Sequence, residues 1–121
     1  MPRLASVTVY CSSSEALHAD HFESARRFGK LLAESGRSLV FGGGRVGLMG
    51  ETARAARSAG GFTLGIITGR LKAAEQLDES NSENIVVKTM RERKALLESR
   101  GDAMVVLPGG LGTLEEFFEI L

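Results

Sequence analysis

The stretch VVLPGGLGTLEEFFEIL, residues 105–121, contains the turn from a predicted strand into a predicted helix. An apolar run comes first, followed by a proline, three glycines and a threonine. The apolar residues beyond the threonine recur at helical spacing and share one face: Leu114, Phe117, Phe118 and Leu121. A buried strand that turns through glycines into an amphipathic helix is typical of an α/β protein.

Upstream of this stretch, short apolar runs alternate with helical patterns. We expect strands at 4–10, 38–44, 62–67, 84–88 and 102–108, and helices at 19–36, 48–61, 90–101 and 113–121. The polar region 70–82 is expected to form a short helix and a loop. Strands separated by helices form β-α-β units and a parallel sheet that is covered on both faces. The sequence therefore predicts one doubly wound α/β domain over residues 1–121.

The composition excludes several classes of protein. The chain has 15 Lys and Arg, 15 Asp and Glu, and a pI near 6.7, so no broad nucleic-acid-binding surface is expected. The sequence has no membrane-length apolar run and no leader-like start, which predicts a cytoplasmic protein. The single Cys11 excludes an internal disulfide and is expected to be a buried small residue. His18 and His21 lack a third ligand, so no metal site is predicted.

The glycine turn LPGGLGT, residues 107–113, has the residue types of an anion site. Glycines let a ligand approach the main chain, and the start of a helix presents unpaired N–H groups and the positive end of its dipole. The hydroxyl of Thr113 adds a further donor. A phosphate is the expected ligand, because the alternative, a plain strand-to-helix turn, would need one glycine only.

Glu116 has two interpretations. With Thr113 it completes a T-x-x-E capping box, in which its carboxylate would satisfy a main-chain N–H. A carboxylate one turn into a helix that binds phosphate would also lie near the sugar of a bound nucleotide. The residues alone leave both interpretations open.

A second glycine cluster, FGGGRVGLMG at residues 41–50, contains a G-x-G-x-x-G spacing at Gly42, Gly44 and Gly47. A nicotinamide site would place this spacing after the first strand, with an acidic residue about 20 residues later. Here it follows the second predicted strand, and the later position reads ITGR without an acid. We expect this loop to pack against a bound nucleotide or against the first glycine loop.

The stretch TMRERKALLES also begins with a capping box, formed by Thr89 and Glu92. Three cations lie in the first turn, Arg91, Arg93 and Lys94, although cations there oppose the helix dipole by roughly 0.3–1 kcal/mol each. A solvated helix face would explain them, and so would a nearby phosphate or catalytic carboxylate. An apolar residue one turn after Arg93 favours an inward position for this arginine.

Three of these motifs, in this order and spacing, resemble the LONELY GUY (LOG) family of cytokinin riboside 5′-monophosphate phosphoribohydrolases: FGGGRVGLMG, MRERK and PGGLGTLEE. Members have often been labelled lysine decarboxylases. The resemblance implies a Rossmann-like fold and a homodimer with its active site near the subunit interface. It implies hydrolysis of the N-glycosidic bond of a nucleoside 5′-monophosphate, AMP or a cytokinin riboside monophosphate, to free base and ribose 5-phosphate. No metal or cofactor is implied.

The resemblance assigns catalysis to Arg93 and Glu116. It assigns substrate binding to a larger set, in which the glycines of the last loop and its threonine hold the phosphate: Lys94, Gly109, Gly110, Gly112, Thr113, Glu115, Glu75 and Gly43. The chain departs from the family pattern at Arg91, where many members have histidine. It also reads IITG after the third predicted strand, where many members have a V-I-P-K run.

Two further expectations concern length and activity. Members of the family continue beyond this point, so the apolar face of helix 113–121 is expected to be covered by chain beyond Leu121, as in a C-terminally truncated sequence, or by a partner subunit. A non-catalytic nucleotide or cofactor carrier with the same glycine loops is the alternative function. A decarboxylase would need a pyridoxal phosphate lysine, for which Lys94 is the only loosely suitable residue.

Overall fold

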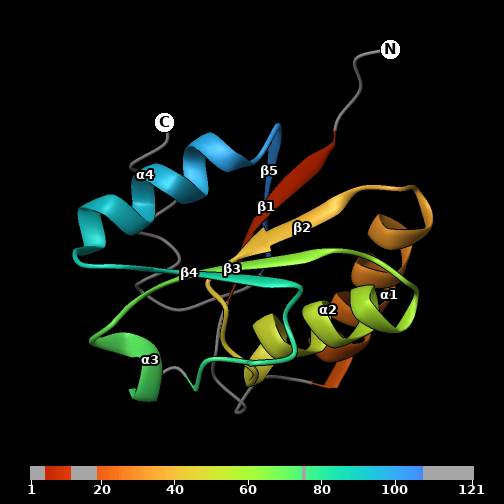
Figure 1. Cartoon of the computed structure of the whole chain (residues 1–121). Coiled ribbons are helices and arrows are strands. Elements are labelled where there is room, and N and C mark those ends of the chain that lie inside the picture. The colour runs from red at the N-terminus through yellow and green to blue at the C-terminus, as the bar shows by residue number, and fades with distance from the viewer. Residues whose placement is uncertain (1–4, 12–18, 75, 108–121) are drawn as a thin grey trace.

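The computed structural model describes residues 5–11, 19–74 and 76–107 (Figure 1). The elements in chain order are β1 (Ser6–Tyr10), α1 (Ala19–Glu34), β2 (Ser38–Phe41), α2 (Gly47–Ser58), β3 (Thr63–Thr68), α3 (Leu71–Ala74), β4 (Glu83–Val87), α4 (Met90–Arg100) and β5 (Ala103–Val106). The alternation predicted for this part of the chain is confirmed, including the short helix α3 and the loop that follows it. The predicted helix 113–121 lies outside the described residues.

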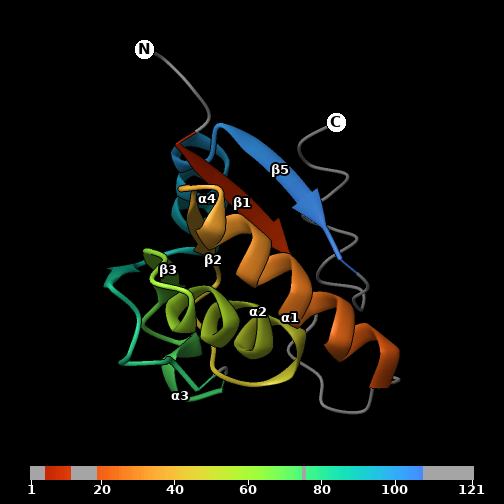
Figure 2. The same cartoon turned by 90° about the vertical axis from the view of Figure 1, so that its right-hand side faces the viewer.

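The five strands form one parallel sheet in the order β4-β3-β2-β1-β5. The chain therefore moves from β1 outward to β4 on one side and then returns to place β5 on the other side of β1. Because crossovers between parallel strands are right-handed, this reversal moves the crossing helix to the opposite face of the sheet. Figures 1 and 2 show α1 and α2 on one face and α4 on the other, as the doubly wound prediction requires.

Each face of the sheet has its own apolar core, because alternate strand residues point to opposite sides. The face under α1 and α2 buries β1 and β2 side chains together with helix residues: Val7, Val9, Cys11, Leu39, Phe41, Ala25, Leu32, Leu48, Met49, Ala53 and Ala56. The face under α4 buries Tyr10, Val40, Leu64, Ile66 and Leu97. The predicted burial of Cys11 is confirmed.

The strand β5 is fastened to the start of β1 by Asp102. The main-chain N–H groups of Ala5 and Ser6 donate to Oδ2 of Asp102 over 2.8 and 3.1 Å. In return, the N–H of Asp102 donates to the carbonyl oxygen of Ser6 over 2.9 Å. These bonds set the register of β1 against β5, in which Val7 pairs with Ala103 and Tyr10 with Val106.

Helix α4 is anchored to the sheet beneath it by Thr8. The Thr8 hydroxyl of β1 donates to the carbonyl oxygen of Leu97 over 2.6 Å, and both residues are buried. The buried hydroxyl thus has a hydrogen-bond partner inside the core. This contact fixes the second half of α4 over β1, so that its first turn lies toward the carboxyl ends of the strands.

Candidate active site

The candidate site lies at the carboxyl ends of the central strands. The N–H of Leu107, just beyond β5, donates to the carbonyl oxygen of Tyr10 at the end of β1 over 2.8 Å. The direction of winding reverses between β1 and β5, and ligands of open α/β sheets bind beyond the strand ends at such a point. The described part of the chain ends here at Leu107, the first residue of the predicted glycine turn 107–113.

Arg93 projects from the first turn of α4 toward the carboxyl ends of β2 and β3, and it is only 4% exposed. Its Nε donates to the carbonyl oxygen of Ile66 in β3 over 2.8 Å, and its Nη2 donates to that of Gly42 after β2 over 3.0 Å. A Cβ added to Gly42 would collide with Nη2, so a glycine is needed for the guanidinium to lie this close. The inward position predicted for Arg93 is confirmed.

The start of α4 is held by the predicted capping box. The N–H of Glu92 donates to Oγ1 of Thr89 over 3.1 Å, and the N–H of Thr89 donates to Oε1 of Glu92 over 3.0 Å. The N–H of Lys88 donates to the same carboxylate oxygen over 3.2 Å. Because the cap fixes the first turn, it also fixes the direction in which Arg93 leaves the helix.

The second glycine loop is hydrogen-bonded to the segment that follows α3. Gly43 has a φ of 89°, a conformation that favours glycine, and its carbonyl oxygen accepts two bonds. The donors are the N–H of Asp78 over 2.8 Å and Nδ2 of Asn81 over 3.3 Å. Beside them, Gly44 forms an isolated antiparallel bridge with Leu77. In this loop, the carbonyl oxygen of Gly42 therefore accepts from Arg93, and the carbonyl oxygen of Gly43 accepts from the segment 76–84.

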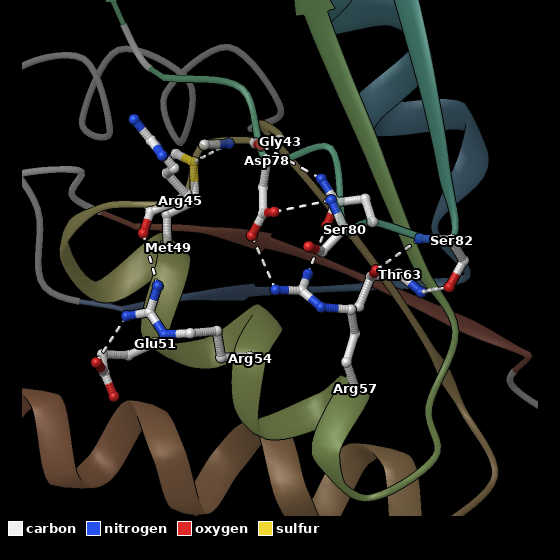
Figure 3. A network of polar contacts seen from close by, with 12 residues as sticks. Gly43, Arg45, Met49, Glu51, Arg54, Arg57, Thr63, Asp78, Ser80 and Ser82 are labelled. Carbon is white, nitrogen blue, oxygen red and sulfur yellow. Dashed lines mark hydrogen bonds and ion pairs between the residues drawn. The ribbon is translucent and has the colours of Figure 1, made fainter.

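A polar network that sequence reasoning missed supports this segment. Arg57 of α2 donates through Nη2 to Oδ2 of Asp78 and through Nη1 to Oδ1 of Asn81, each over 2.8 Å. The Asn81 Nδ2 also donates to Oδ1 of Asn84 over 3.0 Å, and Asn84 Nδ2 donates to the carbonyl oxygen of Asp78 over 3.0 Å. Figure 3 shows Arg57 reaching from α2 to Asp78, with Ser80 bonded to the same carboxylate.

The pKa of the Asp78 carboxyl group reflects this network. Burial by itself would raise it, but the N–H of Ser80 and the charge of Arg57 outweigh burial. The pKa of Asp78 therefore lies below its ordinary value of 3.8.

Acidification should weaken the fold through Asp78. A carboxyl group with a lowered pKa stabilises the folded chain above its unfolded pKa, and this stabilisation disappears as the pH falls through the folded pKa. We expect the free energy of unfolding to fall between neutral pH and about pH 3, and to fall less for Asp78→Asn. Urea unfolding at both pH values measures this, with the exposed neighbour Glu79→Gln as the control. Parallel losses in wild type and Asp78→Asn would contradict the assignment.

The structure brings together two of the site residues predicted from the sequence, Arg93 and Gly43. Arg93 donates to the carbonyl oxygen of Gly42, and Gly43 is the next residue of the same glycine loop. Lys94, next along α4, is half-buried and takes part in an interaction in this structure. The other predicted site residues lie outside the described part of the chain: Glu116, Gly109, Gly110, Gly112, Thr113, Glu115 and Glu75. Their roles stay predictions.

Among the described residues, no group of three or more His, Cys, Asp or Glu side chains could hold a metal ion. In residues 5–11, 19–74 and 76–107, every helix is too short or too polar to cross a membrane.

Comparisons with known proteins agree with the fold and the motifs. A family model described as "Possible lysine decarboxylase" matches residues 49–121. The "Cytokinin riboside 5'-monophosphate phosphoribohydrolase" of Mycobacterium tuberculosis is 48% identical over 113 residues, which cover 93% of this chain and 60% of that protein. The "Probable cytokinin riboside 5'-monophosphate phosphoribohydrolase LOGL9" of Oryza sativa subsp. japonica is 43% identical over 119 residues, 98% of this chain and 52% of that protein.

A solved structure is similar over nearly the whole chain. It is the molybdenum cofactor binding protein from Rippkaea orientalis, with a TM-score of 0.80, 27% identity, and coverage of 96% of this chain and 69% of that one. The likeness supports the Rossmann-like α/β fold. The chain itself spans little more than half the length of the two curated relatives, at 60% and 52%.

Proposed function

Because the chain belongs to the LOG family, through the model described as "Possible lysine decarboxylase", we propose that it hydrolyses the N-glycosidic bond of a nucleoside 5′-monophosphate. The products are the free base and ribose 5-phosphate. The curated relatives that support this are named for the same class of reaction. Homodimerisation and a cytoplasmic location, expected from the resemblance and the composition, belong to the same proposal.

The observation that carries the proposal is the buried guanidinium of Arg93. Removing a cation from water is costly unless it is hydrogen-bonded, and a core position on a helix is usually filled by an apolar side chain. Here the carbonyl groups of Gly42 and Ile66 hold the cation in one orientation at the ligand-binding edge of the sheet. Such a fixed cation is suited to a phosphate or a carboxylate.

The mechanism that we propose follows from the chemistry of the bond. Cleavage of a ribosyl–base bond passes through an oxocarbenium-like state with positive charge on the sugar. The loop 109–113 holds the phosphate and thereby positions C1′. Glu116 stabilises the cation and either takes a proton from the water that adds to C1′, or attacks C1′ itself to form an ester that water then hydrolyses to ribose 5-phosphate. Arg93 orients Glu116 or contacts the phosphate and the leaving base. The base nitrogen takes up a proton from solvent as the bond breaks, so that the reaction as a whole adds one water across the bond.

The test is a comparison of substrates with and without the phosphate. AMP and isopentenyladenosine monophosphate should both release free base, followed by chromatography, and the matching nucleosides should react more slowly. We expect kcat/KM to fall about tenfold to 150-fold for each hydrogen bond lost with the phosphate, because a bond to a charged group contributes roughly 1.5–3 kcal/mol. Equal rates for nucleosides and monophosphates would refute the assigned phosphate site.

A carrier is the second candidate, favoured by the similarity to the molybdenum cofactor binding protein. A carrier would bind a monophosphate in the same loops without breaking it. Calorimetric titration with AMP distinguishes the two candidates: binding without base release supports the carrier, and base release supports the hydrolase. If AMP is neither bound nor cleaved, both candidate functions are contradicted.

A further inference from the structure

The two carbonyl groups that hold Arg93 are set by residues that do not touch it. Gly42 is followed by Gly43, and Ile66 is preceded by Gly65. The carbonyl group of Gly42 belongs to the peptide that joins Gly42 to Gly43, and a glycine leaves this peptide free to rotate unless something else holds it. The carbonyl group of Ile66 lies one peptide beyond Gly65 in β3, where Gly65 pairs with Asn84 and Ile66 pairs with Ile85 of β4. The orientation of Arg93 depends on what fixes these two glycines.

Both glycines contact the same pair of asparagines. At Gly43, the carbonyl oxygen accepts from Nδ2 of Asn81 over 3.3 Å. At Gly65, an added Cβ would collide with Oδ1 of Asn84 and would lie 2.9 Å from Nδ2 of Asn81 and 2.7 Å from Cα of Gly43. The asparagine pair thus lies against β3 and the glycine loop together, on the residues next to the two acceptors.

The asparagine pair is itself held rigidly. Asn81 is buried, and its Oδ1 accepts from Arg57 while its Nδ2 also bonds Asn84. Asn84 in turn donates to the carbonyl oxygen of Asp78. A network of this kind favours one arrangement, because a rearrangement would leave polar atoms of the buried Asn81 without partners.

We infer that Asn81 and Asn84 are positioning residues for the guanidinium of Arg93. Through Gly43 and Gly65 they hold the carbonyl groups of Gly42 and Ile66 at the spacing that grips Nε and Nη2. The consequence for catalysis rests on the proposed function, but the consequence for the geometry of Arg93 does not.

The Asn81→Asp substitution tests this most directly. Aspartate keeps the size of the side chain and the oxygen that accepts from Arg57, and it loses the donor to the carbonyl oxygen of Gly43. The control is Ser82→Ala, which removes the bond from the N–H of Thr63 to Ser82 Oγ (3.0 Å) in the same segment, away from the glycine loop (Figure 3).

The first measurement is the exchange with solvent of the Arg93 Nε–H, followed by NMR and assigned by its absence from Arg93→Lys. We expect exchange to speed up about fivefold or more in Asn81→Asp and to stay unchanged in Ser82→Ala. Unchanged exchange in folded Asn81→Asp, or equal acceleration in both variants, would overturn the inference. If Asn81→Asp fails to fold, Asn84→Ala removes the support of Asn81 Nδ2 and is read in the same way.

The second measurement is kinetic and separates this inference from the proposed function. A small misplacement of a positioning group lowers kcat/KM about tenfold to 100-fold, so Asn81→Asp should lose this much while Ser82→Ala keeps wild-type turnover. Accelerated exchange together with an inactive wild type would refute the hydrolase and leave the positioning role standing. Unaltered turnover in an Asn81→Asp variant with accelerated exchange would refute the catalytic part.

Discussion

Replacing Arg93 with alanine is expected to lower kcat/KM for nucleoside monophosphate hydrolysis on the order of 10²–10³-fold, the usual cost of removing one fixed donor from a reacting centre. The same change should destabilise the fold, because the carbonyl groups of Ile66 and Gly42 lose their donor. A buried polar group left unsatisfied costs about 1–3 kcal/mol. Base release and urea unfolding measure the two effects separately.

The substitution Arg93→Lys distinguishes a catalytic loss from a loss of folding. Lysine keeps the charge, but its single ammonium group cannot reproduce the planar fork that reaches two carbonyl groups at once. We expect Arg93→Lys to lose most of the activity. Its loss of stability should be smaller than that of Arg93→Ala. The exposed neighbour Arg91→Ala is the matched control and should change neither quantity appreciably. Near-normal turnover in folded Arg93→Lys would argue against a role for the guanidinium in catalysis.

The second large effect is expected from Glu116→Gln. Glutamine has nearly the same shape as glutamate but neither a negative charge to stabilise the sugar cation nor a base to activate water. We expect kcat to fall about 10²–10⁴-fold, the range for loss of a positioned acid or base group. The affinity for AMP should be retained, because the phosphate is assigned to the glycine loop. Single-turnover assays and calorimetric titration measure the two quantities.

The control for Glu116→Gln is Glu119→Gln, which removes a carboxylate from the same predicted helix without touching the motif. Its turnover should equal that of wild type. If Glu116→Gln and Glu119→Gln both turn over substrate at the wild-type rate, Glu116 acts as the helix cap that its spacing with Thr113 also allows. In that case Glu116→Gln should change neither kcat nor stability appreciably, because glutamine also completes a capping box.

The order of strands and helices could be predicted because every strand in the described chain is a short apolar run and most helices end at a glycine. The inward position of Arg93 could also be predicted, since Leu97 follows one turn later and marks the buried face of α4. These are local patterns, and local patterns are what one sequence reveals.

The support of the glycine loop could not be predicted in the same way. The stretch LDESNSEN is part of a polar region, and nothing in the local sequence distinguishes Arg57 from Arg54, the other arginine of its helix. The ion pair between Arg57 and Asp78 joins residues 21 positions apart in the sequence. Such a pairing depends on how α2 and the segment after α3 meet in three dimensions. Only the structure shows that these residues converge on Gly43.

The placement of β1 between β2 and β5 has a consequence for the order in which the chain folds during synthesis. The bond from Ala5 to Asp102 spans 97 residues, so the first strand gains its second neighbour only when almost the whole described chain exists. Contacts between such distant residues form slowly, because the intervening chain must first be closed into a loop. Until Val106 has left the ribosome, one edge of β1 stays open, and an open strand edge is a template on which another chain can add. The first strand lies between two neighbours in the finished sheet, but it is a vulnerable edge of the nascent one.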